Sequence, residues 1–195
     1  MKYKLVIFVG LAAIICACQT PDKERHAMQL AVQAMKTHSH NASNIDSTIW
    51  ALNLLDSAIR LSPSPTFYLC KYQIYVVTNN QRAALRVCDS ALMVDKYNYI
   101  ATLDKGRTFE ALGRYDSSNR YYRVALAMLD NPNSFRSAAI AKDHERIVIT
   151  ALLKDTSDFK KLVDQFRAKY RDSKDELSKS YLEEFDHFRR ERYLN

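Results

Sequence analysis

The sequence predicts an all-α fold of helical hairpins stacked one after another. Three observations carry this prediction: the scarcity of glycine and proline, the globular composition, and a repeat along the body of the chain. Only 3 of the 195 residues are glycine and 4 are proline, too few for the many turns of a sheet protein of this length. Apolar residues make up 47% of the chain and charged residues 26%, which is typical of a globular rather than a disordered protein.

The N-terminus reads as a targeting segment rather than as part of the fold. Residues 1–17 place Lys2 and Lys4 before an apolar run from Leu5 to Ala17, the order found in secretory signal peptides. As a helix this run would span about 20 Å, short of the roughly 30 Å hydrocarbon core of a bilayer. We therefore expect no transmembrane anchor here.

The end of this run, Ile15-Cys16-Ala17-Cys18, resembles a bacterial lipobox. The resemblance implies that Cys18 is lipidated and becomes the first residue of the mature chain, which holds it to a membrane. Gln19 follows, and the absence of Asp at this position implies the outer membrane of the cell envelope. A plain signal peptide cleaved nearby is the alternative.

The body of the chain repeats every 33 or 34 residues. Three triplets with an internal spacing of four and three are Ala51-Leu55-Ala58, Ala84-Cys88-Ala91 and Ser118-Tyr122-Ala125. This spacing places each triplet on one stripe of a helix, and small side chains let a neighbouring helix approach. A second helix is expected before each triplet, so that every repeat forms a hairpin.

Two glycines mark the best-defined hairpin. Gly106 falls inside the helix expected at 99–112, where glycine costs about 1 kcal/mol relative to alanine. We therefore expect a close approach of the second helix at Gly106. Gly113 is placed to end the first helix in the left-handed conformation.

These features resemble the tetratricopeptide repeat (TPR) family. The family positions matched are Gly106, Phe109, Gly113, Tyr115, Tyr122 and Ala125. The resemblance implies repeats at 46–65, 66–98 and 99–132 within a single domain, 18–195, wound as a right-handed superhelix with a concave face. In the second repeat, Asn79-Asn80 serves as the turn.

The remaining elements match the family less well. A first helix is expected at 21–37, after Thr20-Pro21 as cap and first-turn proline, with a polar loop from His38 to Ile45. A degenerate hairpin is expected at 133–170. A capping helix at 173–192 begins with the capping box Ser173-x-x-Glu176 and closes the array with one apolar and one polar face.

No motif in the sequence indicates catalysis, a cofactor or a metal site. His38 and His40 are interpreted as solvated loop residues, since no further ligands accompany them. His144 shares a helix side with Ile140 and Ile147, so we interpret it as a partly buried packing residue. The chain is expected not to be an enzyme.

Cysteines and charge limit the possible partners. Cys70 and Cys88 are interpreted as two packed thiols, with a disulfide as the alternative that an exported protein would permit. Without Lys2 and Lys4 the chain has 27 cations against 22 acids. This small, dispersed excess argues against nucleic acid as a partner.

The sequence thus predicts a lipid-anchored adaptor that binds a protein or peptide. By resemblance to the family, the concave groove is lined by Cys70, Ile74, Val77, Leu103, Arg107 and Glu110. An apolar strip beside one cation and one anion suits an extended or helical peptide. The alternatives are a small-ligand or glycan-binding lipoprotein in nutrient uptake, and a structural spacer. The partner's identity, a periplasmic or surface orientation, and the oligomeric state stay open.

Overall fold

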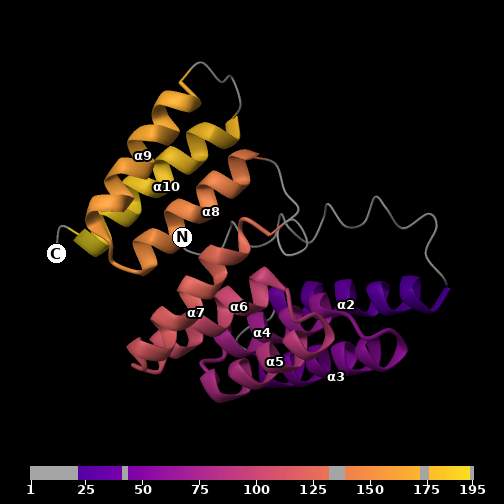
Figure 1. Ribbon diagram of the computed structural model, residues 1–195. Coiled ribbons are helices and arrows are strands. Elements are labelled where there is room, and N and C mark those ends of the chain that lie inside the picture. Colours follow the sequence, from indigo (N-terminus) through magenta and orange to yellow (C-terminus); the bar gives the residue numbers. More distant parts are fainter. Residues whose placement is uncertain (1–21, 41–43, 132–138, 172–175, 194–195) are drawn as a thin grey trace. The chain divides into compact units, whose positions relative to one another are not determined.

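The computed structural model describes residues 22–40, 44–131, 139–171 and 176–193 (Figure 1). Every regular element in these ranges is an α-helix, which confirms the all-α prediction. The chain divides into two compact units, Met1–Lys96 and Tyr97–Asn195. The predicted signal segment and the predicted lipidation site, Cys18, lie outside the described residues. No helix in the described ranges is long and apolar enough to cross a membrane.

Unit 1 consists of two helical hairpins. Its helices are α2 (Asp22–His40), α3 (Ile45–Leu61), α4 (Pro65–Val77) and α5 (Gln81–Val94). Helices α2 and α3 pack side by side (Figure 1) through small, buried side chains such as Ala31, Ala34 and Ala51. Helix α4 packs against α3 and α2 and pairs with α5. The predicted stripe Ala84-Cys88-Ala91 is fully buried on α5.

Unit 2 contains one hairpin of the predicted type, a second hairpin and a terminal helix. Its helices are α6 (Tyr99–Ala111), α7 (Tyr115–Met128), α8 (Ala139–Leu152), α9 (Thr156–Lys169) and α10 (Glu176–Tyr193). Helix α10 packs against both α8 and α9, with Phe185 almost completely buried. The predicted residues 133–138 and 173–175, and with them Ser173 of the capping box, lie outside the described residues.

Helix α7 approaches α6 closely at Gly106. A Cβ at this position would lie 2.7 Å from two ring carbons of Tyr122 and 3.3 Å from Cβ of Tyr121. The expected close approach is thereby confirmed. Gly113 has a φ of 71°, which confirms the predicted left-handed end of α6.

Three hairpins share one turn. Asn79, Gly113 and Lys154 each have a positive φ and each stand second after a helix end. In each turn the following residue donates its backbone N–H five residues back, to Tyr75, Phe109 and Thr150 respectively. This is the Schellman arrangement, which satisfies carbonyls at the end of a helix. The turn at Lys154 carries no glycine or asparagine, so the sequence did not reveal it.

The first hairpin corrects one prediction. Helix α2 continues to His40, so the polar loop expected from His38 begins later. His38 is almost fully buried against α3, where its Nδ1 lies 3.5 Å from the Thr48 hydroxyl oxygen. The physical reason is that His38 continues the four-and-three spacing of the alanine stripe on α2. Burial lowers the pKa of His38, while His40 is exposed.

Candidate functional site

The six predicted groove residues lie on two helices, three on α4 in unit 1 and three on α6 in unit 2. On α4, Val77 is 49% exposed and Cys70 is half-buried, but Ile74 is fully buried. Ile74 belongs to the core between α2, α3 and α4. It is therefore not available as a contact residue, contrary to the prediction.

On α6 the same correction applies to Leu103. This side chain is only 3% exposed and belongs to the main core of unit 2. The large apolar residue that α6 does expose is Ile100, at 46%. Ile100 lies seven residues before Arg107, and two helical turns bring these residues to the same face. Ile100 lies three residues before Leu103, so it continues the stripe that the sequence predicted. Packing in the core buries Leu103 and leaves Ile100, one turn earlier, exposed.

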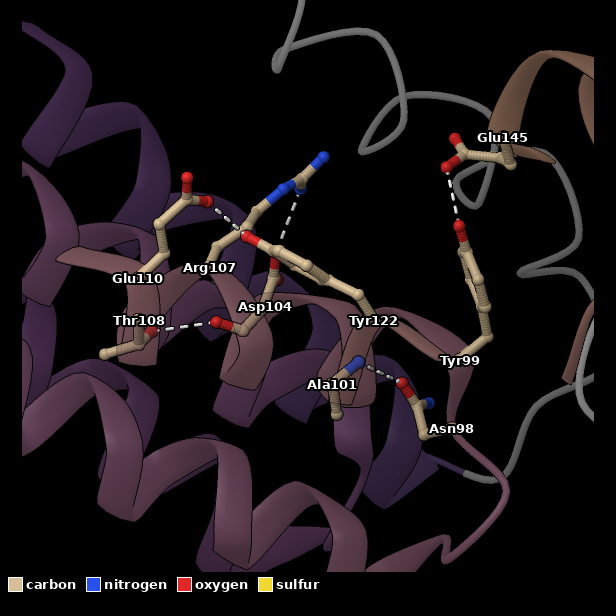
Figure 2. Close-up of polar contacts among 9 residues, drawn as sticks. All are labelled: Asn98, Tyr99, Ala101, Asp104, Arg107, Thr108, Glu110, Tyr122 and Glu145. Carbon is tan, nitrogen blue, oxygen red and sulfur yellow. Dashed lines mark hydrogen bonds and ion pairs between the residues drawn. The ribbon is translucent and has the colours of Figure 1, made fainter. Parts of the chain in front are cut away.

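The side chain of Arg107 is partly exposed to solvent and forms an ion pair with the buried Asp104. Its guanidinium Nη1 lies 3.1 Å from Asp104 Oδ1 (Figure 2), and the two side chains are 45% and 11% exposed. Burial raises the pKa of Asp104, and the charge and hydrogen bond of Arg107 oppose this shift. Burial and Arg107 therefore act in opposite directions on the pKa of Asp104, and the contact with Asp104 holds the Arg107 side chain in place on α6.

Glu110 is held by the second helix of the hairpin. The hydroxyl of Tyr122 donates a hydrogen bond of 2.6 Å to Glu110 Oε2 (Figure 2). The Tyr122 ring is completely buried, and burial together with this hydrogen bond raises the pKa of the phenol. The ring that packs against Gly106 thus also positions a carboxylate on α6.

A second polar group begins at the first residue of α6. The hydroxyl of Tyr99 donates a hydrogen bond of 2.7 Å to Glu145 Oε2 on α8 (Figure 2). Burial first, and then the charge and hydrogen bond of Glu145, raise the pKa of Tyr99. Asn98 caps the helix, since its side chain accepts a hydrogen bond of 2.9 Å from the backbone N–H of Ala101.

His144 connects this group to α10. Its Nδ1 lies 3.7 Å from Glu145 Oε1, and its Nε2 lies 3.0 Å from Glu184 Oε2. The ring stacks on Tyr181 with centroids 3.8 Å apart. Burial acts to lower the pKa of His144, but the two carboxylates outweigh it and raise the pKa to about 9. His144 is therefore buried and packed as predicted, but it is also charged, which the sequence did not indicate.

Cys70 and Cys88 are thiols rather than a disulfide, as the sequence favours, and burial raises the pKa of Cys70 to about 11. Among the residues that the structure describes, no group of three His, Cys, Asp or Glu side chains is placed to hold a metal ion.

A cleft of about 180 Å³ lies between α8 and α9. Its lining combines charged groups with an apolar floor: Asp143, Arg146, Ile147, Leu162, Gln165, Phe166 and Lys169. Asp143 accepts hydrogen bonds from both Lys169 and Tyr170. Ordinary small-molecule pockets occupy about 300–1,000 Å³, so this cleft is small for a ligand site.

Comparison with protein-family models gives no match to the chain. Comparison with curated proteins gives no significant similarity. The function must therefore be argued from the fold and from the arrangement of side chains on α6.

Proposed function

We propose that the chain is a non-catalytic TPR-type adaptor that binds a protein partner through the exposed face of α6. In this proposal the lipid on Cys18 anchors it to the bacterial outer membrane. The resemblance of the sequence to the repeat family supports the adaptor role. The shared turn of three hairpins agrees with it, because equivalent turns are what a repeated hairpin would produce.

The single observation that carries the proposal is the pairing of Ile100 and Arg107 on one face. One supplies an exposed apolar side chain and the other an exposed cation, at 46% and 45%. Arg107 is already held by Asp104, so less side-chain freedom is lost when a partner binds. An apolar contact beside a fixed charge suits a helical or extended peptide segment.

Helix α4 in unit 1 contributes to the proposal separately. Val76 and Val77 at its C-terminal end are 39% and 49% exposed, and Cys70 lies half-buried two turns earlier. We propose that this end of α4 is a separate apolar contact surface of unit 1.

Site-specific photo-crosslinking in cells tests the proposal. A photoreactive residue is placed at Ile100, and at Arg120 as a matched control that is exposed on α7. We expect a discrete protein adduct from position 100 that is absent from position 120. Adding Arg107→Gln, which keeps an N–H donor for Asp104 but removes the charge, should weaken the adduct at position 100. Identical adducts from both positions, or none from position 100, would refute the proposal.

The cleft between α8 and α9 favours a second candidate, the binding of a small ligand or glycan. Its volume of about 180 Å³ would hold one small group rather than a sugar ring with its neighbours. The two candidates differ in one measurement. A glycan binder should lose affinity for the glycan when Gln165 in the cleft is changed and keep it when Ile100 is changed. An adaptor should lose affinity for its protein partner when Ile100 is changed and keep it when Gln165 is changed.

A further inference from the structure

A continuous series of polar contacts crosses three helices of unit 2. It begins at the Tyr99 hydroxyl on α6, which donates to Glu145 on α8 at 2.7 Å. It continues from Glu145 to His144 at 3.7 Å and ends at Glu184 on α10, 3.0 Å from the His144 ring. The first residue of α6 and the C-terminal helix therefore share one partly buried network.

The docking of α10 on this part of α8 depends strongly on His144. Three residues of α10 contact it, namely Tyr181 by stacking, Glu184 by an ion pair and Phe185 by a ring contact with centroids 5.5 Å apart. Glu184 and Phe185 follow Tyr181 by three and four positions, so both lie on the side of α10 that carries Tyr181. A change in the charge or position of His144 would act on that whole face.

Tyr99 influences His144 through Glu145. Burial disfavours the charged form of Glu145, but hydrogen bonds from His144 and Tyr99 hold its pKa below the ordinary value. His144, Tyr99 and the charge of Arg107 all favour the ionised form of Glu145, and removing the Tyr99 hydroxyl takes away one of its two hydrogen-bond donors. The ion pair with His144 then weakens, because a carboxylate that is less ionised attracts the imidazolium less.

We infer that the partner-binding helix α6 is coupled to the C-terminal helix α10 through Glu145 and His144. This inference deepens the proposed function and rests on it for what occupies α6. Tyr99 directly precedes Ile100, the exposed apolar residue of the proposed contact face. A partner that shifts the start of α6 pulls the Tyr99 hydroxyl away from Glu145 and loosens α10. By linkage, the state of α10 alters the affinity of α6 for its partner by the same factor.

Amide hydrogen exchange of the isolated protein tests the coupling without any partner. Tyr99→Phe removes only the hydroxyl that donates to Glu145 on α8. Tyr122→Phe is the matched control, because it removes a tyrosine hydroxyl of the same hairpin that donates to a different glutamate, Glu110 on α6. We expect Tyr99→Phe to raise exchange rates in α10 by about two- to thirtyfold, the range given by coupling energies through packed networks. Tyr122→Phe should leave the α10 rates unchanged.

A second measurement separates coupling from a general loss of stability. The pKa of His144, followed by NMR, should fall in Tyr99→Phe and stay constant in Tyr122→Phe. If Tyr99→Phe does not fold, Glu184→Gln provides the reciprocal test, and it should raise exchange at the N-terminal amides of α6.

Three results would overturn the inference: exchange that changes only in α6 and α8, equal effects of the two tyrosine variants on α10, or no effect of Glu184→Gln on α6. Each of these results leaves the crosslinking test of the adaptor proposal intact. Conversely, coupling without any adduct at position 100 would refute the adaptor alone.

Discussion

Gly106→Ala should destabilise unit 2, although alanine is the better helix former. The new Cβ would lie 2.7 Å from two carbons of the Tyr122 ring, a separation at which one of the groups must move. The ring has little room to do so, because it is completely buried and its hydroxyl is bonded to Glu110. Overpacking of this kind costs about 1–3 kcal/mol.

The helix propensity of alanine offsets part of this cost. Replacing glycine within a helix gains about 1 kcal/mol. Because the contact is close and its partner is fixed, we place the steric cost in the upper half of its range. The net loss of unfolding free energy is then about 1–2 kcal/mol, and Gly106→Leu should lose more. For a chain of this length, 1 kcal/mol corresponds to about 2–4 °C in Tm.

Urea denaturation followed by circular dichroism measures the loss. The control is Ala111→Gly, at an exposed position of the same helix, which reports propensity without a steric contact. A double variant, Gly106→Ala with Tyr122→Leu, should lose less than the sum of the two single changes, because the smaller side chain makes room. If Gly106→Ala is as stable as wild type, or more stable, the close packing of α6 on α7 is wrong.

Three other outcomes are expected. Cys18→Ala should abolish labelling by a fatty-acid probe and leave unprocessed precursor, whereas Cys16→Ala should be processed normally; the opposite result would refute the lipidation assignment. The pKa of His144 in the folded protein is about 9, above the ordinary histidine value of 6.5. The stabilising contribution of His144 is therefore complete below pH 6.5 and is lost as pH rises through about 9. Urea midpoints at pH 7 and pH 10 should therefore differ less in His144→Gln than in wild type. Intact-mass measurement after alkylation in denaturant should show Cys70 and Cys88 both blocked without reductant. In the folded protein Cys70 should be alkylated more slowly than in denaturant, because burial raises its pKa to about 11.

The sequence predicted those features of the hairpins that the type of a single residue indicates. Glycine is a poor helix residue, so Gly106 in a helical pattern needs a contact to explain it, and the contact with Tyr122 is there. Asn79 and Gly113 belong to the residue types that adopt a positive φ readily, and both do. Lys154 has the same backbone conformation, but its residue type carries no such signal.

The site was predicted less well because burial depends on neighbours that periodicity cannot name. A stripe on α6 can be read from spacing, but whether Leu103 or Ile100 faces solvent depends on which other helices pack around α6. Likewise, two carboxylates raise the pKa of His144. Glu145 is its neighbour in the sequence, but Glu184 lies forty residues further along the chain. The contact with Glu184 arises from tertiary packing and leaves no mark on local sequence.

The structure also shows which substitutions can test the adaptor proposal and which cannot. Gly106 lets the Tyr122 ring lie against α6, and the same ring positions Glu110 through its hydroxyl. A change at any of these three residues therefore alters packing and surface together, and loss of partner binding would not identify a contact. Reversing the charge of Arg107 has the same defect, because a glutamate there would meet the buried Asp104.

Ile100 has no such second role in the hydrophobic core, since it is 46% exposed. Ile100→Ser should accordingly leave the unfolding free energy within about 0.5 kcal/mol of wild type while weakening partner recovery, and only that combination assigns the face of α6 to binding.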